Sequence, residues 1–126
     1  MVLLAERHGR ALKMGPHLTL PGFQERSRSI THFFGTRRGP HYGATSGELG
    51  IVKAEEPDFT EVVSVQQVHG TDVLVLNHPV QVGETFSGGW DAILTNQPNL
   101  LVTVRTADCV PALLADPHQR MVGGVH

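Results

Sequence analysis

The sequence predicts a sheet-rich chain of the α/β or α+β class, built mainly on a mixed β-sheet. Short β-branched and apolar runs recur along the chain, and 14 glycines and 8 prolines separate them at close intervals. This punctuation favours strands and turns over long helices. The length of 126 residues corresponds to about one domain and is enough to bury a core without metal or disulfide staples.

The elements follow from the apolar runs and the turn residues between them. Residues 1–29 are the least decided segment, with a short helix expected within residues 3–14 because Gly15-Pro16 would stop it. Residues 37–50, 53–58 and 80–89 are expected to be loops or turns because they are rich in glycine, proline or charge. Strands are expected at 30–36, 62–65, 73–76, 90–95, 100–104 (buried on both faces), 112–115 and 121–125, the last two forming a hairpin.

Composition and charge exclude several classes of protein. The 10 lysine and arginine residues against 12 acidic ones give a net charge of −2, and the sequence pI is about 6.4. This balance argues against an electrostatic binder of nucleic acid or of an anionic membrane. The single cysteine excludes an internal disulfide framework and fits a reducing compartment. With no apolar run long enough to span a bilayer, we expect a cytoplasmic chain.

Three metal-competent side chains stand at the ends of apolar runs: His69, Cys109 and His126. They lack the close ligand pairs of a zinc finger, but two histidines and a thiolate fit a catalytic zinc with an open fourth position. The same set fits a His2Cys copper site, for which Met121 is the nominal axial ligand. Two ordinary roles stay open, because a cysteine is often a small core residue and a histidine before glycine is often a turn residue.

Two further segments carry candidate polar groups. Asp108 is either a proton-transfer or orienting carboxylate, or a turn or cap residue that binds local backbone amides. Arg37 and Arg38 either clamp an anion such as phosphate or lie on a solvated loop. The six other histidines are expected at the surface or in turns. They are His8, His17, His32, His41, His78 and His118.

Five segments together resemble the YfiH-type laccase-domain family, whose members were once named multicopper polyphenol oxidases and are now mostly regarded as purine nucleoside phosphorylases. The resemblance runs nearly continuously from residue 30 to residue 126 and is loose before it. The segments, in family order, are HFFGTRRG (32–39), QQVHGTDV (66–73), WDAILTN (90–96), TADCVPALLADP (106–117) and VGGVH (122–126).

The resemblance implies a fold, a metal site and an activity. The fold is similar to the Cys-His hydrolase-like sandwich around a mixed sheet. Zinc would be held by His69, Cys109 and His126, with copper as the alternative ion. The implied reaction is phosphorolysis of adenosine, inosine, guanosine or methylthioadenosine, with adenosine deamination beside it. Purine nucleoside and phosphate would be the partners, Arg37 would bind substrate, and Asp108 and Cys109 would be the catalytic residues.

The chain also departs from the family pattern. Family members continue after the last histidine into a second half, so residues 30–126 are expected to be an N-terminal half, and the fold a truncated one. Glu48 stands where the family has asparagine, and the stretch 50–67 is short. A truncated sheet would expose an edge and self-associate. Alternatives are a non-catalytic remnant or interaction module, a metal-free cysteine hydrolase using Cys109, and, least favoured, a copper-dependent polyphenol oxidase.

Overall fold

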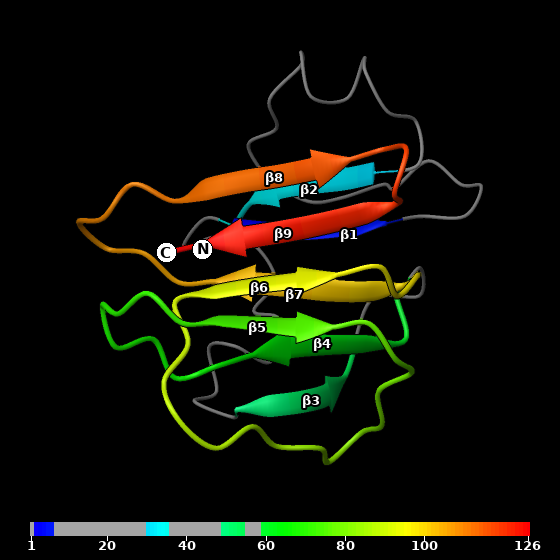
Figure 1. Cartoon of the computed structure of the whole chain (residues 1–126), viewed down its shortest axis with the longest axis horizontal. Helices are drawn as coiled ribbons and strands as arrows, with labels where there is room; N and C mark the ends of the chain where they lie inside the picture. The colour runs from blue at the N-terminus through cyan, green and yellow to red at the C-terminus, as the bar shows by residue number, and fades with distance from the viewer. Residues whose placement is uncertain (1, 7–29, 36–48, 55–58) are drawn as a thin grey trace.

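The computed structural model consists of two stacked β-sheets (Figure 1). It describes residues 2–6, 30–35, 49–54 and 59–126, the first of these segments by its backbone alone. Within these residues every regular element is a strand, and no helix is long and apolar enough to cross a membrane. The strands are β1 (Val2–Glu6), β2 (Ile30–Phe34), β3 (Gly50–Lys53), β4 (Glu61–Ser64), β5 (Val73–Leu76), β6 (Ala92–Thr95), β7 (Leu100–Val104), β8 (Ala112–Asp116) and β9 (Met121–Val125).

Both sheets are mixed, as the sequence predicts. The first has the strand order β2-β1-β7-β4-β3, and the second has the order β5-β6-β9-β8. Each contains one parallel pair, β4 with β7 in the first sheet and β5 with β6 in the second; the other pairs are antiparallel. A buried threonine hydroxyl ties each parallel pair, since Thr103 Oγ1 donates to Val63 O and Thr95 Oγ1 donates to Leu76 O, both at 2.8 Å.

The main core lies between the two sheets. Val63, Leu100 and Val102 of the first sheet pack against Leu74, Leu76 and Ile93 of the second, and all are at most 8% exposed. The neighbouring residues Val62 and Leu101 point the other way and pack with Phe33 and Phe59 on the opposite face of the first sheet. The first sheet is therefore buried on both faces, which confirms the two-sided burial predicted for residues 100–104.

The predicted hairpin near the end of the chain is also confirmed. Strands β8 and β9 pair antiparallel from Ala112↔Val125 to Asp116↔Met121. The Asp116 carboxylate closes the turn by accepting the amides of His118 and Gln119 through Oδ1, at 2.9 and 3.0 Å. This side-chain-to-backbone bonding is the usual reason for an aspartate at the start of a turn.

Three expectations were wrong. Residues 2–6 form strand β1 instead of the start of a helix, because β1 is inserted between β2 and β7, pairings that local propensity does not encode. Residue 50, expected to end a loop, and residue 53, expected to begin a charged turn, both belong to β3, which pairs with β4 at the edge of the first sheet. His32, expected at the surface, is fully buried in β2.

The two sheets approach closely at Gly124 in β9. A Cβ atom on this residue would lie 2.6 Å from Val104 Cγ2, which belongs to the facing strand β7. Val104 is only 3% exposed, and a β-branched side chain has little rotamer freedom with which to move away. The spacing of the two sheets therefore requires glycine at this position. Gly124 is the penultimate residue of β9, and His126 follows directly after that strand.

We expect Gly124→Ala to lower the free energy of unfolding by about 1–3 kcal/mol, the usual cost of overpacking a core. The matched control is Ala115→Val, which adds methyl groups to an exposed position on the neighbouring strand β8. Chemical denaturation of both variants measures the difference. Equal stability of Gly124→Ala and the unsubstituted chain would show that the sheets do not meet at this residue.

Candidate metal centre

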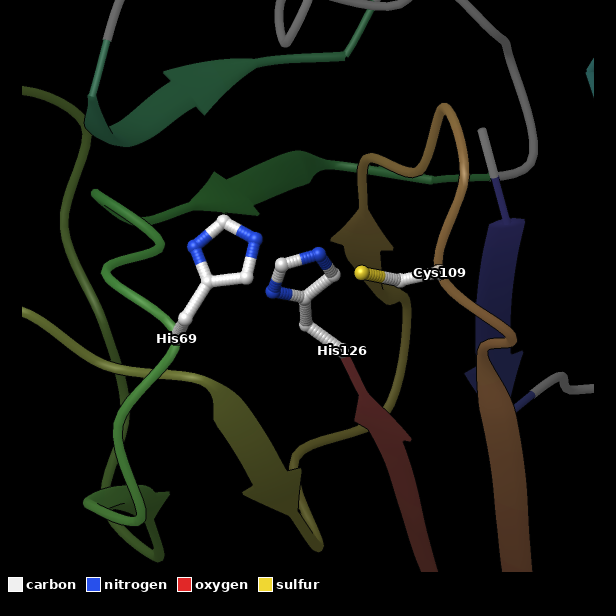
Figure 2. A group of neighbouring side chains, drawn as sticks. All are labelled: His69, Cys109 and His126. Carbon is white, nitrogen blue, oxygen red and sulfur yellow. The ribbon is translucent and has the colours of Figure 1, made fainter.

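The structure brings His69, Cys109 and His126 together, although 40 and 17 residues separate them along the chain. One ligand atom from each residue lies within 4.8 Å of those of the other two. Figure 2 shows that the three side chains come from three separate segments and converge on one region. These segments are the connection between β4 and β5, the connection between β7 and β8, and the residue that follows β9.

The donor set fits a transition-metal ion. Two imidazole nitrogens and a thiolate are ligands that zinc and copper accept, and three protein ligands leave a position for water or substrate. Zinc bonds of about 2.0–2.3 Å require ligand atoms closer to one another than 4.8 Å, a gap that small side-chain rotations would close. His69 and Cys109 are exposed, so the region is accessible from solvent, whereas the side chain of His126 is only 7% exposed.

The two imidazoles are packed against each other. Their ring centroids lie 4.7 Å apart, with an angle of 67° between the ring planes. This edge-to-face arrangement is the favoured geometry for a pair of aromatic rings. The two rings therefore present their nitrogens from two directions. In Figure 2 the Cys109 sulfur lies on the side of His126 that is away from His69.

A buried carboxylate, that of Asp91, lies at the centre of the hydrogen bonding around the two histidines. It immediately precedes β6 and is 5% exposed. Its Oδ1 accepts the amide of His69 at 2.9 Å and lies 2.9 Å from His126 Nδ1. Its Oδ2 accepts the amides of Gly70 at 2.6 Å and Val68 at 3.2 Å.

The electrostatics of Asp91 follow from these contacts. Burial alone raises the pKa of this carboxyl, but the hydrogen bond with His126 and the amides of Gly70, His69 and Val68 outweigh it. The net effect lowers the pKa of Asp91 from 3.8 to about 2. The carboxylate is thus ionised at neutral pH, and it places a negative charge beside the two imidazoles.

A second bridge ties the loop of Cys109 to the loop of His69. The side-chain amide of Gln67 donates from Nε2 to Arg105 O at 2.7 Å, and its Oε1 accepts the Arg105 amide at 2.8 Å. One side chain therefore satisfies both backbone groups of a residue 38 positions away. This pairing joins the two connections that carry the histidine and the cysteine.

A small cavity adjoins the site. Its volume is about 190 Å³, and its polar lining includes Asp91 and His126. Most of its wall is apolar and comes from the outer face of the second sheet. The apolar residues of this wall are Val73, Ala92, Leu94, Leu114 and Val125.

Of the catalytic and substrate-binding candidates outside this cluster, the structure describes Asp108. Asp108 is exposed in the β7–β8 connection, next to Cys109. Arg37 and Glu48 lie outside the residues that the structure describes. Asp91 and Gln67 were not expected to act at the site. Both lie within segments that carry the family resemblance, but their partners are 21–38 residues away, so no local pattern identifies their role.

Comparison with known proteins agrees with the predicted resemblance. Residues 50–126 match the sequence model of a family described as multi-copper polyphenol oxidoreductase laccase. This match includes all three residues of the candidate metal centre and the Asp91 and Gln67 bridges.

Curated relatives carry the name purine nucleoside phosphorylase. One from Streptomyces coelicolor is 42% identical over 92 residues, which cover 67% of this chain and 37% of the relative. One from Streptomyces griseus is 42% identical over 69 residues, covering 55% of this chain and 28% of the relative. One from Deinococcus radiodurans is 39% identical over 64 residues, covering 49% and 22%.

The matched segments thus span between 22% and 37% of the length of these three relatives. No solved structure matches the chain significantly. The family model nevertheless covers more than half of the 126 residues, including the whole candidate metal centre. By this match the chain belongs to the multi-copper polyphenol oxidoreductase laccase family.

Proposed function

We propose that this chain carries the metal centre of a zinc-dependent purine nucleoside phosphorylase. The observation that supports this most is the convergence of His69, Cys109 and His126, within the segment that matches the family. The names of the relatives supply the reaction class. Adenosine, inosine, guanosine and methylthioadenosine are the proposed nucleosides, phosphate is the second substrate, and adenosine deamination is a proposed further activity.

Zinc is the ion we favour over copper. Two imidazoles and one thiolate form a three-ligand zinc site with a vacant fourth position, the usual arrangement of a catalytic zinc. A single His2Cys site holds one ion, whereas the reduction of dioxygen by a multicopper oxidase needs several copper ions. The donor set of this chain therefore supports the phosphorylase over the oxidase that the family description names.

The roles of the individual residues follow from their chemistry. A zinc ion bound here would act as a Lewis acid on a purine or ribose oxygen or nitrogen, or on a water molecule. Cys109 would serve as a deprotonated ligand, which removes it from the role of free nucleophile. Asp108, exposed beside it, is the proposed proton-transfer group. Arg37 is proposed to hold the phosphate through its planar guanidinium.

The mostly apolar cavity beside His126 is suited to bind a planar, largely apolar group of a ligand. Its volume of about 190 Å³ is below the range of roughly 300–1,000 Å³ typical of pockets for whole small molecules. It therefore suits one ring system, such as the purine base, with the sugar and phosphate outside it. His126 lines both the cavity and the metal centre, so a base in the cavity would lie next to the ion.

A second candidate function is a metal-binding module without catalysis. The matched segments span at most 37% of the length of the three compared relatives, so turnover is not implied for this chain by the match. A metal-free cysteine hydrolase is a third candidate, because the Cys109 sulfur lies within 4.8 Å of both imidazoles and a histidine base is thus within reach.

Metal content tests the proposed centre. We expect about one zinc ion per chain after purification without chelators, measured by elemental analysis. His69→Ala removes one of the three ligands and should abolish stoichiometric zinc, whereas His78→Ala, an exposed histidine outside the cluster, should retain it. Zinc in neither the unsubstituted chain nor the control would contradict the metal centre.

Turnover separates the three candidate functions. For the phosphorylase we expect phosphate-dependent release of base from inosine or adenosine, lost on treatment with a chelator and restored by zinc. A hydrolase using Cys109 would tolerate the chelator and lose its activity to thiol alkylation. A zinc-loaded chain without phosphate-dependent turnover would favour the module without catalysis. Liberated hypoxanthine and adenine, measured by chromatography, provide the readout.

We also propose that the chain acts in the cytoplasm and self-associates through an open sheet edge. Strand β8 ends the second sheet, and its Leu114 is 48% exposed. An unpaired strand with an apolar residue is a template for pairing with a second copy.

Light scattering after size exclusion should therefore show a concentration-dependent dimer, which Leu114→Lys weakens. The matched control is Val82→Lys, which adds the same charge at a loop residue that is 60% exposed. A monomer at every concentration would contradict the proposal.

A further inference from the structure

Asp91 contacts both histidines of the candidate metal centre but is not among the predicted ligands. The other groups around it belong to the backbone: the Asp91 amide donates to Asp72 O at 3.1 Å, and the His126 amide donates to Asp91 O at 2.8 Å. The residue is thus fixed from both sides, and its carboxylate is directed at the segment 68–70 and at the His126 ring.

The first consequence concerns the backbone of His69. This residue has φ of 60°, in the left-handed region that residues other than glycine seldom occupy. Such a conformation is strained for a residue with a Cβ atom and persists only where its surroundings impose it. Here three successive amides, those of Val68, His69 and Gly70, converge on one carboxylate, which is the arrangement of an anion-binding nest. The carboxylate of Asp91 therefore stabilises the backbone conformation that directs His69.

The second consequence concerns the ring of His126. Its Nδ1 lies 2.9 Å from Asp91 Oδ1, and an ionised carboxylate only accepts hydrogen bonds. This contact therefore requires a proton on Nδ1, which leaves Nε2 as the ring nitrogen whose lone pair can bind a metal ion. A metal ion requires such a lone pair, and a carboxylate on the opposite nitrogen is a common way to fix the ring and its tautomer.

We propose that Asp91 is the positioning residue of the metal centre, holding His69 through its backbone and His126 through Nδ1. This inference rests on the proposed metal centre. One carboxylate sets the direction of one imidazole and the tautomer of the other, so the two rings are oriented before an ion arrives. Its negative charge also offsets part of the charge of a divalent cation beside the Cys109 thiolate.

Two substitutions separate these effects. Asp91→Ala removes both the nest anion and the partner of His126 Nδ1. Asp91→Asn keeps a carbonyl oxygen that can accept a hydrogen bond from His126 Nδ1. Its side-chain NH2 group, however, replaces the oxygen that accepts the backbone amides of Val68 and Gly70, so donors face donors there. Asp72→Asn is the matched control, because Asp72 is exposed and contacts Asp91 through its backbone oxygen.

The first measurement is the affinity of the full chain for Zn²⁺, determined by competition with a chromogenic chelator. We expect a loss of about 100-fold for Asp91→Ala and about 10-fold for Asp91→Asn, within the range usual for residues that support metal ligands. Asp72→Asn should match the unsubstituted chain. Unchanged affinity in both Asp91 variants would overturn the proposal.

The second measurement needs no metal. In the metal-free chain, long-range ¹H–¹⁵N correlation spectra should show His126 protonated at Nδ1, retained in Asp91→Asn and shifted toward Nε2 in Asp91→Ala. A purely structural role would lower stability without changing this tautomer in the folded variant. His126 protonated at Nε2 alone, with no proton on Nδ1, in the unsubstituted chain would overturn the proposal even if Asp91→Ala failed to fold.

The two measurements distinguish the failure of this inference from the failure of the proposed function. If the unsubstituted chain binds no Zn²⁺, the zinc centre is wrong, and the His126 tautomer alone decides whether Asp91 positions the ring. If the chain binds Zn²⁺ and both Asp91 variants bind equally well, the centre stands and the positioning role falls.

Discussion

A single buried negative charge links the segments around the candidate metal centre. The Asp91 carboxylate lies in a position that is 5% exposed, where an ionised group without partners would cost several kcal/mol. Three amides and one imidazole surround it, so the charge is compensated by groups from the β4–β5 connection and from the end of β9. Removing the partners would leave that charge uncompensated, which explains why these segments must come together when the chain folds.

The sandwich supplies the rigid frame on which this arrangement depends. The sheet pairs β6 with β5 on one side and with β9 on the other, so Asp91 and His126 stand at the same end of adjacent antiparallel strands. Gly124 lets β9 lie close against the facing strand β7, from which the Cys109 loop departs. The Gln67 amide then joins that loop to the one that carries His69. The close packing of the sheets therefore limits how far the three side chains can move apart.

Much of this frame could be predicted from the amino-acid sequence. The runs at 73–76, 100–104 and 121–125 became strands with those bounds, because continuous apolar runs between turn residues are typical of strands. Strand β3 was missed since Gly50–Lys53 is short and adjoins charged residues. Strand β1 was missed because its place between β2 and β7 depends on pairing with residues far along the chain.

The site was predictable only in part, for the same reason. Ligand spacings of 40 and 17 residues are too long to signal a metal site by themselves. The place of His69, Cys109 and His126 at the ends of apolar runs made them candidates, and the family resemblance made a shared metal ion the leading interpretation. Asp91 and Gln67 act through hydrogen bonds across 21–38 residues, and neither residue type is distinctive at such positions. Their contribution became visible once the fold placed donors and acceptors side by side.

The proposed metal centre requires one ion to be held jointly by His69, Cys109 and His126. X-ray absorption at the zinc edge of the zinc-loaded chain tests it most directly, because it reports the ligand atoms themselves. We expect one sulfur at about 2.3 Å with nitrogen ligands at about 2.0 Å, and loss of the sulfur shell in Cys109→Ser. A first shell of oxygen and nitrogen alone, identical in both proteins, would contradict it.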